Sequence, residues 1–203
     1  AFPCTIGLAV LGEPIFLLLF PGTAQTAPMA AMMMYVGAFA VVFYAMSTLS
    51  NGLLQGINRM RIPVTNAAIS LVAHVILLVI LMLFFHLKIY AVVIANMFFA
   101  LMMCVMNSMA IRKYSGYKQE VIKTFVIPAI SSVIMGIITW LFYHGCHALL
   151  KSNAISTILA IMIAAIVYAV TLLLFKGLSE EEILRFPKGA LLVRIAKKLH
   201  LLR

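Results

Sequence analysis

The chain has 203 residues, of which 65% are hydrophobic and only 10% are charged. Soluble domains carry about 25% charged residues, so there is too little charge here to cover a surface that faces water. The apolar residues also come in runs of about 20, the length that crosses a hydrocarbon core of about 30 Å. The composition therefore excludes a soluble domain and predicts an all-α integral membrane protein.

Six apolar runs predict six transmembrane helices. In chain order they cover about 4–20, 29–57, 62–86, 89–111, 121–149 and 154–175. The second is longer than the bilayer requires at about 1.5 Å of rise per residue. Its end is expected to project past the hydrocarbon or to bend near Gly52. Pro63 lies at the start of the third helix, where proline is tolerated.

The positive charges fall on one side of these spans. The loops after the second and fourth spans, together with the tail, hold all of the fifteen Lys and Arg except Lys88 and Lys151. Cytoplasmic loops of membrane proteins carry such an excess, so the sequence predicts a cytoplasmic C-terminus. The residues on that side are Arg59, Arg61, Arg112, Lys113, Lys118, Lys123, Lys176, Arg185, Lys188, Arg194, Lys197, Lys198 and Arg203.

The net charge of +10 does not indicate nucleic acid, because the basic residues lie between apolar runs and in the tail. Anionic membrane lipids are the expected partner of the tail, residues 177–203. Ser179 and Glu182 form a possible capping box, and Pro187 would end that helix. Beyond it, Leu191 and Ile195 continue a helical spacing. An amphipathic helix in the headgroup layer and a packed or frayed cytoplasmic helix are equal alternatives.

No catalytic constellation is visible, so we expect neither an enzyme nor a metal or cofactor site. The histidines are scattered, the cysteines share no metal or redox spacing, and Glu13 is the only acid before Glu120. Glu13 lies in the first span, where it is either a buried charge or a residue of the outer interface. His144 and His147 could share a helix face, and solvated side chains are their expected state.

Polar side chains inside apolar spans are costly unless they pack inward or line a wet cavity. Asn51 and Gln55 lie near the cytoplasmic end of the second span, while Asn66, Ser70 and His74 follow at i, i+4 and i+8 in the third. These five are candidates for a substrate path, and His74 could carry a proton. The alternative is that they form hydrogen bonds between helices.

Three segments resemble a known family. They are IGLAVLGEPIFLLLFPG at Ile6 to Gly22, LLQGINRMRIPVTNAAISLVAHVILLVILM at Leu53 to Met82, and GLSEEEILRFPKGALLVRIAKKLHLL at Gly177 to Leu202. With them the chain resembles the C-terminal part of the polysaccharide-export flippases of the MOP (MATE-like) superfamily. The nearest branch is similar to the stage V sporulation protein B group, and the lipid II flippase MurJ is a more distant relative.

The resemblance implies helices nine to fourteen of a fourteen-helix protein in a bacterial plasma membrane. Residues 1–113 would belong to the second helix bundle, 114–176 would form two added transmembrane helices, and 177–203 the cytoplasmic tail. The implied activity is the flipping of an undecaprenyl-pyrophosphate-linked sugar or peptidoglycan precursor by alternating access. The other partners would be the missing N-terminal helices of the same protein, since the chain is expected to be a fragment. The resemblance assigns no residue a substrate-binding role.

Two other functions remain open. A MATE-type exporter of small molecules or drugs would share the fold but would need a small cation-coupled site. A complete six-span protein could instead act as a structural or assembly partner in the membrane.

Overall fold

The structure is a computed structural model that describes residues 1–23, 25–115, 122–175 and 177. These residues form six long helices and one π-helical turn, η1, that leads into the fifth. The helices are α1 Phe2–Leu19, α2 Ala27–Gly56, α3 Arg61–Leu83, α4 Ile89–Ser115, η1 Ile122–Val126, α5 Ile127–Leu150 and α6 Asn153–Leu174. No strand occurs in the described ranges.

All six helices are long and apolar enough to cross a membrane, so the chain is a multi-pass membrane protein. The predicted all-α membrane fold and its six spans are confirmed, with ends that differ by a few residues. Pro63 lies in the first turn of α3 and is buried. There its missing N–H leaves no hydrogen bond unmade. The tail predicted at 177–203 lies outside the described residues, apart from Gly177.

Each of the four described reversals between consecutive helices contains a residue with positive φ. Gly22 (φ 97°) lies between α1 and α2, and Asn58 (φ 58°) between α2 and α3. His86 and Lys88 turn α3 into α4, and Lys151 turns α5 into α6. Left-handed backbone reverses the chain within a few residues, and Gly and Asn adopt it most readily. The consequence is three tight hairpins and one slightly longer turn.

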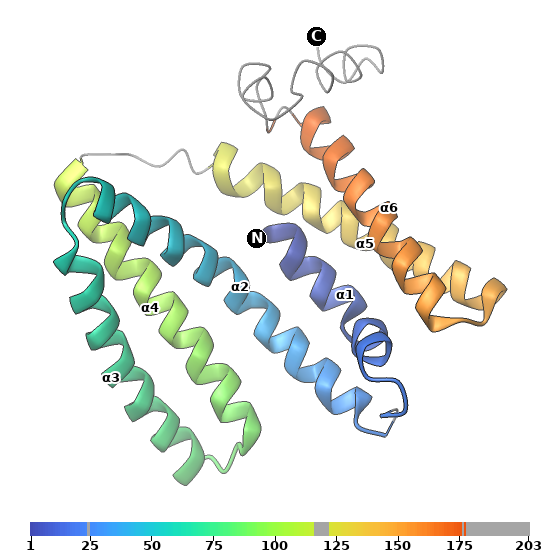
Figure 1. Ribbon diagram of the computed structural model, residues 1–203, viewed down its shortest axis with the longest axis horizontal. Helices are drawn as coiled ribbons and strands as arrows, with labels where there is room; N and C mark the ends of the chain where they lie inside the picture. The colour runs from blue at the N-terminus through green and yellow to red at the C-terminus, as the bar shows by residue number, and fades with distance from the viewer. Residues whose placement is uncertain (24, 116–121, 176, 178–203) are drawn as a thin grey trace.

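The reversals give the molecule two ends (Figure 1). We call the end where α2, α3 and α4 meet the basic end, because it carries Arg59, Arg61, Arg112 and Lys113. The turns with Lys88 and Lys151 lie at the opposite end.

The helices α3, α4, α2 and α1 follow one another in a row, and the α5–α6 hairpin packs on the far side of α1 (Figure 1). Small residues line the closely packed helices: a Cβ atom placed on Gly37 of α2 would lie 3.7 Å from Cγ1 of Val93 on α4, and Ala38 of α2 and Ala95 of α4 are almost wholly buried. Small side chains allow the close backbone approach on which helix contacts in membranes depend. The Thr5 hydroxyl on α1 donates to the Ala38 carbonyl at 2.9 Å. Helix α1 is therefore tied to α2 on one side and to the hairpin on the other.

A glycine sets the distance between α1 and α5. A Cβ atom placed on Gly136 would lie 2.5 Å from Cγ2 of Ile6 and 3.4 Å from Cγ2 of Val10. Both of these side chains are β-branched, so their Cγ2 atoms cannot swing away freely inside a helix. Position 136 therefore accepts only glycine at this helix separation.

We expect Gly136→Ala to destabilise the protein by about 1–3 kcal/mol, the usual cost of overpacking. Gly145→Ala, in the same helix, is the matched control because nothing lies within 4 Å of the added methyl group. Alanine is the better helix former by about 1 kcal/mol, so the control should be neutral or stabilising. Reversible unfolding of the detergent-solubilised protein measures both changes. Equal stability of the two variants would contradict the close α1–α5 contact.

Candidate functional site

Three asparagines form a hydrogen-bonded chain across α2, α3 and α4. Nδ2 of Asn66 donates to Oδ1 of Asn107 at 2.9 Å, and Nδ2 of Asn107 donates to Oδ1 of Asn51 at 2.7 Å. Asn107 is fully buried and Asn66 nearly so. We call this set the amide chain. It lies toward the basic end and links three helices through side chains alone.

Hydroxyl groups in the same helices behave differently. Ser47 and Thr48 both donate to the Tyr44 carbonyl, and Ser50 donates to the Met46 carbonyl, all within α2. A hydroxyl can bond back to its own helix three or four residues earlier. A primary amide has two N–H donors and a carbonyl acceptor. A buried asparagine therefore needs hydrogen-bond partners beyond its own helix. The amide chain is the result.

The predicted stripe of Asn66, Ser70 and His74 does share one face of α3, and that face packs on α4. The Ser70 hydroxyl points at the Met106 sulfur at 3.8 Å. Nδ1 of His74 lies 2.9 Å from the Ala95 carbonyl oxygen. At these atoms the structure shows contacts between helices, which was the alternative to a substrate path. Lining of a path by the stripe stays a prediction.

The hydrogen bond of His74 determines which nitrogen carries the proton. A carbonyl oxygen only accepts, so Nδ1 must be the N–H donor in this contact. The ring also meets Phe99 edge-on, with centroids 6.0 Å apart. Nε2 has no hydrogen-bond partner among the described residues, and the side chain is only half-buried. His74 is thus anchored to α4 by one nitrogen.

Of the remaining candidates, Gln55 and Glu13 lie apart from the stripe. Asn51 joins it through the amide chain, but Gln55 is exposed one turn further along α2. Glu13 is exposed as well, although burial was one of the two states expected for it. The reason is its place on α1: its neighbours Gly12 and Pro14 face other helices and are buried, which turns the carboxylate outward. Whether Glu13 is a buried charge in the membrane stays a prediction.

A fourth asparagine joins the other three helices at the opposite end. Asn153, the first residue of α6, accepts from the Tyr143 hydroxyl at 2.9 Å and from the Thr157 hydroxyl at 3.2 Å. Its Nδ2 donates to the Pro14 carbonyl at 3.0 Å. We call this the Asn153 cluster. It ties α1, α5 and α6 together as the amide chain ties α2, α3 and α4.

The five substrate-path candidates from the sequence leave out the central residue of each group. Asn107 lies in a run of apolar residues, and its polarity inside a span is the one signal that marks it. Asn153 follows Lys151 and Ser152, a composition typical of a turn or a helix cap. Nothing in its local sequence indicates a contact with Pro14, which lies in the first helix.

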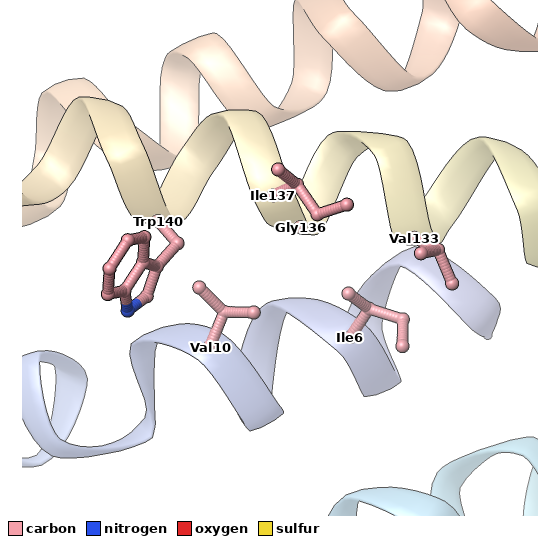
Figure 2. A pocket seen from close by; sticks show the side chains of 6 residues that line it. All are labelled: Ile6, Val10, Val133, Gly136, Ile137 and Trp140. Atoms are coloured by element: carbon pink, nitrogen blue, oxygen red, sulfur yellow. The ribbon is translucent and has the colours of Figure 1, made fainter.

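An apolar pocket of about 300 Å³ lies between α1 and α5. Figure 2 shows its side chains, which reach toward one another from the two helices. They are Ile6, Val10, Val133, Gly136, Ile137 and Trp140. The lining of the pocket is almost wholly apolar.

The histidines of α5 lie in an aromatic cluster beyond Trp140. Nδ1 of His144 lies 2.9 Å from the Trp140 carbonyl oxygen, and His147 stacks on Tyr143 with ring centroids 5.6 Å apart. In the described part of the chain, no three His, Cys, Asp or Glu side chains come close enough together to hold a metal ion. These contacts indicate that both histidines pack against aromatic residues, at the end of the molecule opposite the basic end.

Comparisons with family models, with curated proteins and with solved structures give no match to this chain.

We expect Asn107→Ala to lower stability by about 1–2 kcal/mol. Each hydrogen bond between membrane helices contributes about 0.6 kcal/mol on average and up to about 1.7, and this change removes two. Asn96→Ala is the matched control, because Asn96 is an exposed asparagine of the same helix. Unfolding of the purified protein in detergent gives both values.

A double-mutant cycle isolates the bond between the two buried amides. Asn66→Ala and Asn107→Ala together should cost less than the sum of the single changes by roughly 0.6 kcal/mol or more. Strictly additive effects, or a loss in Asn96→Ala equal to that in Asn107→Ala, would contradict the amide chain.

Proposed function

We propose that these helices belong to a bacterial plasma-membrane transporter that flips an undecaprenyl-pyrophosphate-linked sugar or peptidoglycan precursor. The substrate class comes from the resemblance of three segments to the MOP flippases. The chain would then correspond to helices nine to fourteen, with residues 1–113 in the second bundle. The structural observation that supports transport is the amide chain, because alternating access requires groups of helices that move as rigid bodies.

Two features agree with this proposal. The amide chain joins α2, α3 and α4 into one unit, while the α5–α6 hairpin attaches through α1. Amide and imidazole groups inside membrane helices are also of the kind that bind the hydroxyl groups of a sugar. Gln55 is exposed, and Nε2 of His74 has no hydrogen-bond partner among the described residues, so both side chains offer polar atoms to a substrate.

The proposed orientation places the basic end in the cytoplasm. Four of the described cations lie at that end, whereas Lys88 and Lys151 lie at the other. The positive-inside rule counts Lys and Arg close to the helix ends. On this basis α6 and the residues after it lead to a cytoplasmic C-terminus.

Transport is tested with the full-length protein that carries these helices, reconstituted in proteoliposomes with a fluorescent undecaprenyl-pyrophosphate sugar. We expect the labelled sugar to cross the bilayer faster than in protein-free vesicles, as measured by its access to an impermeant quencher. Export of a small cationic dye down an ion gradient, without sugar flipping, would establish a MATE-type exporter instead. Absence of both activities in folded protein would favour a structural or assembly role.

Variants of His74 distinguish a stripe that carries protons from one that only packs the helices together. If His74 carries protons, His74→Ala should lower flipping and flatten its dependence on pH. His74→Asn is the informative partner variant, because its amide can still donate to the Ala95 carbonyl but cannot titrate. A proton carrier predicts a flat pH profile in both variants. Normal flux and a normal pH profile in His74→Asn would assign His74 to helix packing.

A further inference from the structure

The basic end holds a group of cations around one aromatic ring. The Cζ atom of Arg59, in the α2–α3 turn, lies 4.8 Å from the ring centroid of Tyr114 at the end of α4. Nζ of Lys113 lies 5.5 Å from the same centroid. All three side chains are exposed. The ring thus holds an arginine and a lysine from two separate segments near one another.

These cations lack a carboxylate partner among the described residues. The only acid in those ranges is Glu13, which lies in α1 away from the α2–α3 turn. Arg61 and Arg112 add two more exposed cations beside Arg59 and Lys113. Like charges gathered in this way repel one another, and the attraction of each cation to an aromatic face offsets the repulsion by only about 0.5–1 kcal/mol at an exposed site. A bound anion would relieve this repulsion.

The group lies at the depth of the lipid headgroups. Helix α4 has 27 residues, which corresponds to about 40 Å at 1.5 Å per residue. The hydrocarbon core is about 30 Å thick, so α4 is longer than the core, and the Arg112 and Lys113 side chains favour its last turn as the part outside. Tyrosine is enriched at this boundary, which agrees with the place of Tyr114.

Apolar side chains accompany the cations. Met60 lies between Arg59 and Arg61 and is 62% exposed, and Ile57 at the end of α2 is 38% exposed. A free phosphate ion would gain nothing from these neighbours. A phospholipid would place its phosphate on the cations and its glycerol and first methylene groups on Met60 and Ile57.

We propose that Arg59, Lys113 and Tyr114 form a binding site for the phosphate of an anionic phospholipid at the basic end. Arginine binds phosphate oxygens through two N–H groups at once, and lysine acts as a point charge. Both cations lie against the Tyr114 ring, so the ring keeps them at the same end of α4. Arg61 and Arg112 raise the local positive potential. This site does not depend on the transport function proposed above.

The test is lipid binding by the purified full-length chain in neutral detergent, followed by native mass spectrometry. The probes are phosphatidylglycerol and the zwitterionic phosphatidylcholine of the same acyl chains. We expect wild-type protein to prefer phosphatidylglycerol. Arg59→Gln and Lys113→Gln should each weaken that binding about fivefold, the effect of one charge near an anionic headgroup, and leave phosphatidylcholine unchanged.

Matched controls remove the same charge elsewhere. Lys88→Gln and Lys151→Gln, at the opposite end, should retain the wild-type preference. Tyr114→Phe should bind like wild type because it keeps the aromatic face, whereas Tyr114→Leu should lose affinity. Equal losses in all four Gln variants, or no loss in any, would overturn the site. Melting temperatures confirm that each variant is folded.

A last competition distinguishes lipid from free anion. Inorganic phosphate at millimolar concentration should displace little bound phosphatidylglycerol, because it cannot use the apolar neighbours. Full displacement by inorganic phosphate would show a site for free anions and overturn the assignment to lipid.

Discussion

Helices in a bilayer gain little from burying apolar surface against one another, because the surrounding lipid tails are as apolar as leucine. Polar contacts and close packing of small residues must therefore hold the helices together. Helix α3 shows this most clearly: its buried residues are Pro63, Asn66 and Ser70, while Val64, Val72 and Leu83 remain exposed. Its attachment to α4 depends on a few polar atoms.

The same constraint divides the molecule into two groups of three helices. Asn107 closes the group α2–α3–α4 toward the basic end, and Asn153 closes the group α1–α5–α6 at the opposite end. In each case one amide reaches two other helices. The groups meet where α1 packs on α2, with the hydrogen bond from Thr5 to the Ala38 carbonyl as their polar contact.

The six helices could be predicted from the sequence because the signal for each span lies in its own residues. An apolar run of about 20 residues predicts a span whatever surrounds it, and Pro63 marks a helix start by its own chemistry. The shared face of Asn66, Ser70 and His74 was predictable from helical periodicity. The partners of these residues were not predictable. Asn107 and Ala95 lie on α4, and the periodicity of α3 does not show which helix packs against it. Glu13 illustrates the same limit: periodicity places it on α1 but not on the exposed side.

The most direct test concerns the rigidity that the amide chain gives to α2, α3 and α4. Spin labels at Leu49 on α2 and Val72 on α3, both exposed, allow the distance between these helices to be measured by pulsed electron paramagnetic resonance after the native cysteines are replaced. A single narrow distance distribution is expected for the protein with Asn107, and a broad one for Asn107→Leu. Asn96→Leu should keep the narrow distribution. An unchanged distribution in Asn107→Leu would contradict the central role of the amide chain.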